Sequence, residues 1–186
     1  GEMIRLLLHH PAVDLLSAHS SSNAGKPLYE VHKDLIGETE LLFADQPFTE
    51  VDILFLCVGH GDAKKFLEQN KIPDAVKIID LSQDFRLTPG SILGNRNFVY
   101  GLPELNREAI KTAQNIANPG CFATAIQLAL LPLAKAGILS DVHTIGITGS
   151  TGAGQSLSVT SHFSWRANNI QAYKSLNHQH IQEITA

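Results

Sequence analysis

The chain has 186 residues, of which 44% are hydrophobic and 17% are charged, and its formal net charge is −4 at pH 7. This composition is that of a folded globular protein and excludes a disordered tail. Charges of one sign form no block along the sequence, so we expect neither nucleic acid nor a membrane as a partner.

Targeting signals and disulfides are not expected either. The longest apolar run, over residues 123–134, is interrupted by Gln127 and Pro132 and is shorter than the ~18 residues that span a bilayer. Only two cysteines occur, Cys57 and Cys121, so a disulfide framework is unexpected and we predict a cytoplasmic protein.

The first quarter of the chain predicts a helix, a strand and a loop. Residues 1–11 have a helical pattern that ends at Pro11. A short strand is expected over residues 13–20. Residues 21–27 are polar and rich in turn formers, so we predict a loop there.

The next segments predict a parallel sheet. Residues 51–58 are almost entirely apolar, which is typical of a central strand covered on both faces, and we expect Cys57 to lie in the core. A helix pattern follows the glycines at 59 and 61, and residues 76–81 form a second apolar strand. This alternation indicates a doubly wound α/β fold.

The second half predicts further elements. A short helix is expected after Asn106, a strand ending near Ala117, and a long apolar helix from Cys121 to about Lys135. Residues 143–149 have a strand-like pattern, and residues 165–186 form a polar tail with a histidine pair.

Cys121 is the candidate nucleophile. The sequence Asn118-Pro119-Gly120 predicts a turn that places this cysteine at the start of a helix. Unpaired N–H groups and the helix dipole stabilise an anion there, either a thiolate or the oxygens of a substrate. The alternative is a cysteine that only packs under the helix.

A thiolate needs a partner that moves protons near neutral pH, and histidine is the usual one. His178 and His180 form a pair in the second part of the chain. A His-x-His pair can also bind a metal. We expect no metal at this pair.

Two polar segments are candidates for cofactor binding. In a doubly wound fold, the loop after an early strand holds the adenosine ribose, and hydroxyls, an amide and a lysine suit the 2′-phosphate of NADP better than the free hydroxyl of NAD. The residues of this type are Ser21, Ser22, Asn23 and Lys26. The second segment is a glycine-rich loop in which Gly152 and Gly154 allow close approach of a ligand.

Six ordered segments resemble one enzyme family. Residues 118–125 (NPGCFATA) are similar to the active-site segment of N-acetyl-gamma-glutamyl-phosphate reductases. The other similar segments are residues 21–27, 79–87, 99–105 and 149–154, together with 178–184. The resemblance covers essentially the whole chain.

The resemblance implies a Rossmann-like NADP-binding domain over residues 1–118 and the start of an α+β substrate and dimerisation domain over residues 119–186. It implies Cys121 as the nucleophile that forms a thioester, and a histidine of the 178/180 pair as the acid/base, with His178 favoured. The cofactor-binding residues that it implies are Ser21, Ser22, Asn23, Lys26, Ser150, Gly152 and Gly154. The substrate-binding residues are Ser82, Arg86 and Asn118.

The chemistry implied is the NADPH-dependent reduction of an N-acyl-glutamyl phosphate to the semialdehyde, with release of phosphate, in arginine biosynthesis. The family further implies a homodimer or homotetramer. Its first strand, its phosphate loop and the remainder of its second domain have no counterpart in this sequence. We therefore expect the chain alone to be unstable or inactive, with Gly1 as the last glycine of that loop.

Two alternatives remain open. An aspartate-semialdehyde dehydrogenase shares the fold plan and the cysteine chemistry, although the Tyr100–Leu105 segment and the spacing of the histidine pair disfavour it. A non-catalytic dinucleotide-binding or scaffold piece is the second alternative, and the intact Cys121 and histidines disfavour that one.

Overall fold

The computed structural model describes residues 1–154 and 158–186 of the chain. Its first part is a small unit built on two short parallel strands, β1 (Ala18–His19) and β2 (Phe43–Ala44). Around them lie α1 (Glu2–Leu8), α2 (Leu28–Val31) and the 3-10 turn η1 (Lys33–Leu35). Leu28, Leu35 and Phe43 are buried together and form the core of this unit.

The second unit is a five-stranded sheet with the order β3-β4-β7-β6-β5. Its strands are β3 (Ile53–Leu56), β4 (Lys77–Asp80), β5 (Ile92–Leu93), β6 (Arg96–Tyr100) and β7 (Asn115–Ala117). All neighbouring strands are parallel except β5 and β6, which are antiparallel. The last residues of the four parallel strands are paired in register and mark the end of the sheet where these strands stop. They are Leu56, Asp80, Ala117 and Tyr100.

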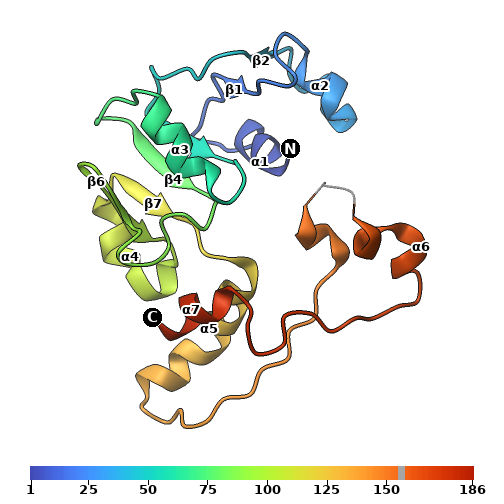
Figure 1. Cartoon of the computed structure of the whole chain (residues 1–186). Helices are drawn as coiled ribbons and strands as arrows, with labels where there is room; N and C mark the ends of the chain where they lie inside the picture. Colours follow the sequence, from blue (N-terminus) through green and yellow to red (C-terminus); the bar gives the residue numbers. More distant parts are fainter. Residues whose placement is uncertain (155–157) are drawn as a thin grey trace.

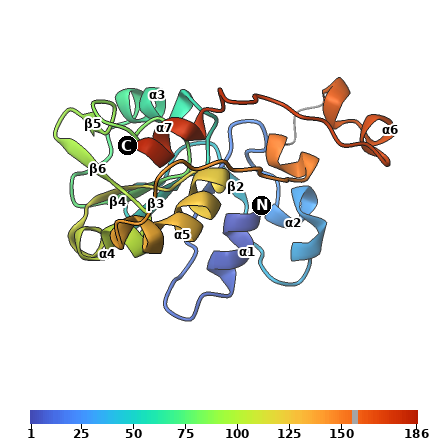
Figure 2. The same cartoon turned by 90° about the horizontal axis from the view of Figure 1, so that it is seen from below.

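Helices cover both faces of this sheet, as the doubly wound pattern requires. Figure 2 shows α3 (Asp62–Gln69) on one face and α4 (Pro103–Thr112) with α5 (Cys121–Lys135) on the other. The main core lies between the sheet and these layers. Its buried residues are Leu56, Ala63, Ile72, Val76, Ile78, Phe85, Phe98 and Ala117.

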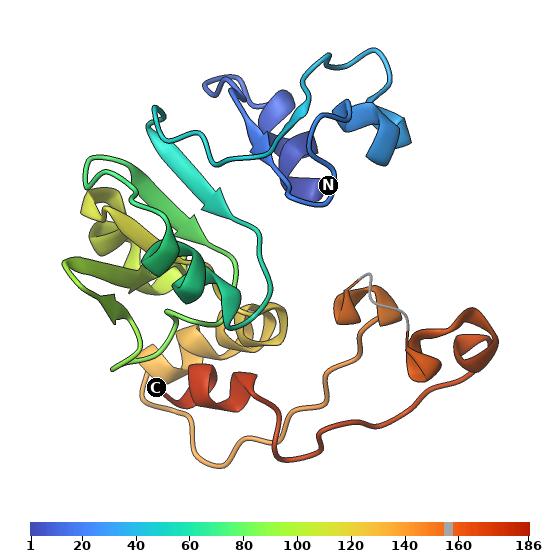
Figure 3. The same ribbon diagram turned by 45° about the horizontal axis from the view of Figure 1, so that its top comes forward.

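The last part of the chain leaves the sheet and returns to it. After α5, a long arm carries η2 (Ser150–Ala153), η3 (Val159–Ser161) and α6 (Phe163–Arg166) away from the other elements (Figures 1 and 3). The chain then comes back as α7 (His180–Thr185), which packs beside α5. Among the described residues, no helix is long and apolar enough to cross a bilayer.

Several predictions from the sequence are confirmed. The opening helix is present as α1, the strand at 76–81 is β4, and the helix predicted from Cys121 to about Lys135 is α5. The helix expected after Asn106 begins earlier, at Pro103, because proline suits the first turn of a helix.

The predictions for residues 51–58 were only partly correct. A strand is present, but β3 lies at the edge of the five-stranded sheet and is not central. Cys57 follows the end of this strand and is exposed, so its assignment to the core was wrong. An unbroken apolar run does not distinguish an edge strand from a central one, because it reports the two faces of a strand and not its neighbours.

Two other strand predictions were wrong in extent or in kind. The strand expected over residues 13–20 is reduced to Ala18–His19. Residues 143–149 form no strand, although Ile145 and Ile147 alternate with polar residues. Both isoleucines are more than four-fifths exposed, at 94% and 86%, so no described strand pairs with this segment.

Arg96 fixes the loop between α3 and β4 onto the sheet. Its guanidinium is nearly buried and donates hydrogen bonds to the carbonyl oxygens of Ile72 (2.9 Å), Pro73 (2.9 Å) and Val76 (3.4 Å). It also donates to Oδ1 of Asn115 on β7 at 2.9 Å. One side chain thus satisfies four acceptors that water reaches poorly.

We predict that Arg96→Ala lowers the free energy of unfolding of the whole protein by about 3 kcal/mol, because it leaves several buried oxygens without donors. Urea unfolding measures this change. The exposed Arg107 is the matched control, since Arg107→Ala should change the free energy by less than about 0.5 kcal/mol. Equal losses in both variants would contradict the role given to Arg96.

Candidate active site

Cys121 lies on the surface at the first residue of α5. The turn before it is anchored to the sheet, because the Asn118 N–H donates to the carbonyl oxygen of Asp80 at 2.8 Å. Gly120 is the N-cap, and its carbonyl oxygen accepts from the N–H and the hydroxyl of Thr124 at 2.8 and 2.9 Å. The first N–H groups of a helix have no partner within it, so the predicted setting of Cys121 is present.

His180 packs directly against the backbone that carries Cys121. A Cβ atom built on Gly120 would lie only 2.3 Å from Nε2 of His180 and 2.7 Å from two of its ring carbons. No side chain larger than hydrogen therefore fits at position 120 without moving the imidazole. The glycine before Cys121 has a steric reason, because it leaves room for the His180 ring.

The two histidines differ in their surroundings. Nδ1 of His178 accepts the backbone N–H of His180 at 3.2 Å, and the two ring centroids are 4.7 Å apart. His180 is buried, and its Nδ1 has no hydrogen-bond partner among the described residues. Burial lowers the pKa of both imidazoles, and the charge of Glu183 partly opposes this effect at His180.

Glu183 lies one turn beyond His180 on α7 and is also buried. Its Oε2 accepts the backbone N–H of Gly120 at 3.0 Å, and its Oε1 accepts from Nη1 of Arg86 at 2.9 Å. The same Oε1 is 3.8 Å from Nε2 of His180. Glu183 therefore links the turn before Cys121 to the histidine and to a cation.

Arg86 joins the loop after β4 to this centre. Besides Glu183, it donates from Nε to the carbonyl oxygen of Asn118 (2.8 Å) and from Nη2 to that of Leu81 (3.1 Å). A guanidinium has five N–H groups, so two remain that no described residue engages. Asn118 is exposed, and Nδ2 of its side chain donates to the carbonyl oxygen of Pro119 at 3.2 Å.

Ser82 takes a different place from the one expected for a substrate ligand. It is fully buried, and its hydroxyl donates to Oδ2 of Asp80 at 2.7 Å and accepts the N–H of Asp84 at 3.0 Å. These bonds shape the loop that carries Arg86. Contact between Ser82 and a substrate stays a prediction.

The residues predicted to bind NADP form a cluster of donors after β1. Nδ2 of Asn23 lies 3.5 and 3.4 Å from the hydroxyl oxygens of Ser20 and Ser22, and Nζ of Lys26 donates to Oδ1 of Asn23 at 3.4 Å. Ser21, Ser22 and Lys26 are exposed, and residues 20–27 contain no carboxylate. A cation among hydroxyl and amide groups fits a phosphate.

The second predicted cofactor segment lies on the arm. Ser150 and Gly152 belong to η2, and Gly154 follows it with φ 85°, a conformation that favours glycine. Among the described residues, no hydrogen bond joins this segment to Cys121 or to the donor cluster after β1. Its part in cofactor binding stays a prediction.

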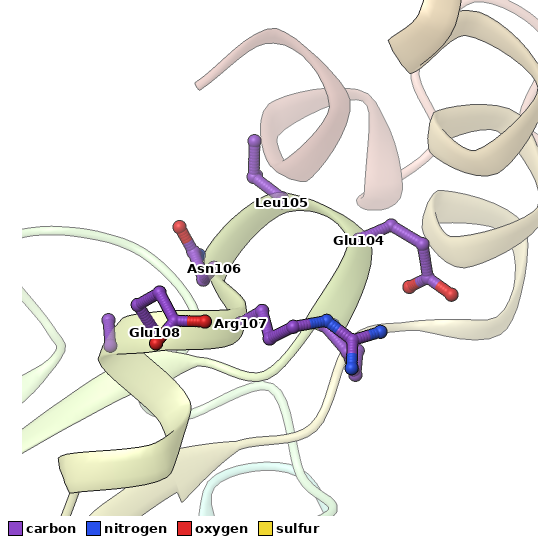
Figure 4. A pocket seen from close by; sticks show the side chains of 7 residues that line it. Glu104, Leu105, Asn106, Arg107 and Glu108 are labelled. Atoms are coloured by element: carbon purple, nitrogen blue, oxygen red, sulfur yellow. The ribbon is translucent and has the colours of Figure 1, made fainter.

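A surface hollow lies elsewhere, beside the first turn of α4. Figure 4 shows its lining, which runs from Pro103 to Ala109 and includes Glu104, Arg107 and Glu108. The helix is kinked there at Asn106, which opens the turn. None of the candidate site residues lines this hollow, so we place the site at Cys121. The described residues contain no cluster of three or more side chains suited to a metal.

Glu183 was missed by the sequence analysis, although a signal for it was available. Residues three apart on a helix lie on the same face, and Glu183 follows His180 by three. A carboxylate beside a histidine at this spacing orients the imidazole or supports its charge.

Comparisons with known proteins agree with the resemblance seen in the sequence. Residues 1–113 match the family model described as semialdehyde dehydrogenase, NAD binding domain, and residues 121–186 match the model described as semialdehyde dehydrogenase, dimerisation domain. Together these two ranges cover nearly all of the chain.

Curated relatives are named N-acetyl-gamma-glutamyl-phosphate reductase. A protein of Christiangramia forsetii is 57% identical over 185 residues, which are 99% of this chain and 56% of the relative. One from Azobacteroides pseudotrichonymphae is 56% identical over 187 residues, covering 100% of this chain and 58% of the relative. One from Bacteroides thetaiotaomicron is 55% identical, with 99% and 56% covered.

The chain thus spans a little more than half the length of the curated relatives that it matches. The matched models assign an NAD binding domain to its first part and a dimerisation domain to its second. The chain belongs to the semialdehyde dehydrogenase family of oxidoreductases.

Proposed function

We propose that the protein reduces an N-acyl-γ-glutamyl phosphate to the corresponding semialdehyde, with Cys121 as nucleophile. The observation that carries this proposal is the arrangement at α5, where an exposed cysteine begins a helix and His180 packs on the residue before it. The names of relatives more than half identical to this chain support the same substrate class.

The first chemical step follows from this arrangement. Sγ of Cys121, having given its proton to an imidazole, attacks the acyl carbon of the substrate. The bond from that carbon to the phosphate oxygen breaks, and phosphate leaves with the electron pair. The product is a thioester on Cys121, and the free N–H groups of the first turn of α5 would stabilise the charge that develops on the carbonyl oxygen.

We assign the proton transfer to His180. Its ring touches Gly120, its Nδ1 is unpartnered among the described residues, and Glu183 supports the imidazolium by its negative charge. His178, which was favoured under the family resemblance, already uses Nδ1 to accept the His180 N–H. We therefore give His178 the role of fixing the backbone of the pair.

Arg86 and Asn118 are the proposed substrate ligands. Two N–H groups of Arg86 are not engaged by described residues and can meet a phosphate or a carboxylate in the geometry that guanidinium favours. The carboxylate of Glu183 neutralises the cation in the free protein. We place Ser82 behind Arg86 as a support of its loop.

NADP is the proposed cofactor. Ser21, Ser22, Asn23 and Lys26 would hold its 2′-phosphate, since they offer hydroxyl, amide and ammonium groups without a nearby carboxylate. We assign Ser150, Gly152 and Gly154 to the same ligand. When bound, the reduced nicotinamide supplies the hydride for the reduction.

Other parts of the proposal concern the whole protein. The matched dimerisation model supports a homodimer or a homotetramer. The boundary between the two domains is proposed after residue 118, in the interval between the two matched ranges. We propose arginine biosynthesis in the cytoplasm as the setting.

A reverse-direction assay of the whole protein tests the reaction. With N-acetylglutamate semialdehyde, NADP⁺ and phosphate, we predict phosphate-dependent formation of NADPH, followed by its absorbance. Cys121→Ser should lower the rate by more than about 1,000-fold, because the nucleophile is lost. Cys57→Ser is the matched control and should change the rate by less than about threefold, since Cys57 takes no part in the chemistry.

Other outcomes of this assay separate the alternatives. N-succinylglutamate semialdehyde, run in parallel, identifies the acyl group. Turnover of aspartate semialdehyde, without turnover of either N-acylglutamate semialdehyde, would support the alternative of an aspartate-semialdehyde dehydrogenase. A folded protein that forms no NADPH from any of these aldehydes would refute the proposed function.

The two cysteines should also differ in alkylation. Although Cys57 is an exposed residue, the protein around its sulfur partly excludes water and raises the pKa of the thiol. Little of this thiol is therefore ionised near pH 7, and its reaction should speed up only at higher pH. We predict that iodoacetamide at pH 7 labels Cys121 at least about tenfold faster, as measured by peptide mass spectrometry. Equal and slow labelling of both cysteines would favour the scaffold reading.

A further inference from the structure

Tyr100 lies at the end of β6 and points its hydroxyl at two acceptors. It donates to Oε1 of Gln127 at 2.9 Å and to Oε2 of Glu183 at 3.1 Å. Burial and the charge of Glu183 raise the pKa of the phenol, so the hydroxyl keeps its proton at neutral pH. A phenol has one proton, so it can make one strong bond to either acceptor at a time.

Gln127 is the second member of this arrangement. It is buried on α5, and its Nε2 donates to the backbone oxygen of Glu183 at 2.9 Å. This bond fixes the orientation of the amide, so Oε1 faces Tyr100 as an acceptor. Gln127 therefore competes with Glu183 for the proton of Tyr100.

The competition changes how Glu183 acts on His180. When Tyr100 donates to Glu183, the carboxylate has three donors, namely Tyr100, Arg86 and the Gly120 N–H. Donors spread the negative charge of a carboxylate and weaken its effect on other groups. When Tyr100 donates to Gln127, more of that charge remains for the imidazole 3.8 Å away.

We propose that Tyr100 is a positioning residue of this site, and that its hydroxyl, shared between Gln127 and Glu183, sets how strongly Glu183 supports a protonated His180. The inference rests on the proposed role of His180 as acid/base. Within the described part of the chain no hydrogen bond joins Tyr100 or Gln127 to Cys121, so both act through Glu183.

The other charged groups around His180 stay constant in this arrangement. They are Glu183 and His178 from its own segment, Arg86 from the loop after β4, and His60 from the loop after β3. Tyr100→Phe changes none of these four groups, whereas Gln127→Met also removes the hydrogen bond from Gln127 to the backbone oxygen of Glu183. A change in the titration of His180 can then be traced to the hydroxyl and its acceptors.

The test is the titration midpoint of His180 in the whole protein, followed by NMR of the ¹³C-labelled Cε1 and assigned with His180→Gln. Tyr100→Phe removes a donor from Glu183 and should raise the midpoint by about half a pH unit, roughly a threefold gain in proton affinity. Gln127→Met removes the competing acceptor and should lower the midpoint. The matched control, Tyr29→Phe, lies in the core unit of β1 and β2 and should leave the midpoint unchanged.

The opposite signs exclude a simple loosening of the site. Because burial lowers the pKa of His180, loosening would raise the midpoint in both variants. Two upward shifts, or no shift in Tyr100→Phe, would overturn the proposal. If Tyr100→Phe does not fold, Gln127→Met decides alone, since a downward shift supports the proposal and any other result overturns it. The titration needs no turnover, so its outcome is independent of the reverse-direction assay.

Discussion

The buried ion pair between Arg86 and Glu183 holds the candidate site together. The two residues are 97 positions apart, their side chains are about 5% exposed, and the joining atoms are 2.9 Å apart. Two charges removed from water are costly unless each finds further partners. Both do so here, because Arg86 also binds two backbone carbonyls and Glu183 also binds the Gly120 N–H and Tyr100. The pair therefore ties the loop after β4, the turn before α5 and the last helix to one another.

This ion pair explains how α7, a short helix that follows a long arm, comes to hold His180 beside the turn that precedes Cys121. The arm itself makes few contacts with the sheet and leaves large apolar residues exposed, such as Ile170 and Leu176. What brings α7 back to α5 is a set of polar bonds to Glu183 and Gln127, with the His180 ring seated on Gly120. The bonds that dock α7 onto α5 also orient His180, the proposed acid/base.

Much of the fold was predictable from the sequence, and the errors have physical causes. Apolar periodicity and the Pro-Gly turn predicted α5 and the place of Cys121, because both depend on local sequence. The edge position of β3 and the missing strand at 143–149 depend on which neighbours are present, which no local pattern reports. Glu183 and Gln127 had available signals: a carboxylate three residues after His180, and a polar residue inside an apolar helix. Their partners could be identified only from the structure, since Arg86 is 97 residues from Glu183 and Tyr100 is 27 residues from Gln127.

A double-mutant cycle on the ion pair tests this account most directly. Urea unfolding of the whole protein would be measured for Arg86→Met, for Glu183→Gln and for the two together. We expect each single change to lower the free energy of unfolding by about 3 kcal/mol or more, since it leaves a buried charge or its partners unmatched. The double variant should lose at least about 1.5 kcal/mol less than the sum of the two single losses. Losses that simply add would show that Arg86 and Glu183 are not coupled, and would contradict the claim that this pair joins the two parts of the site.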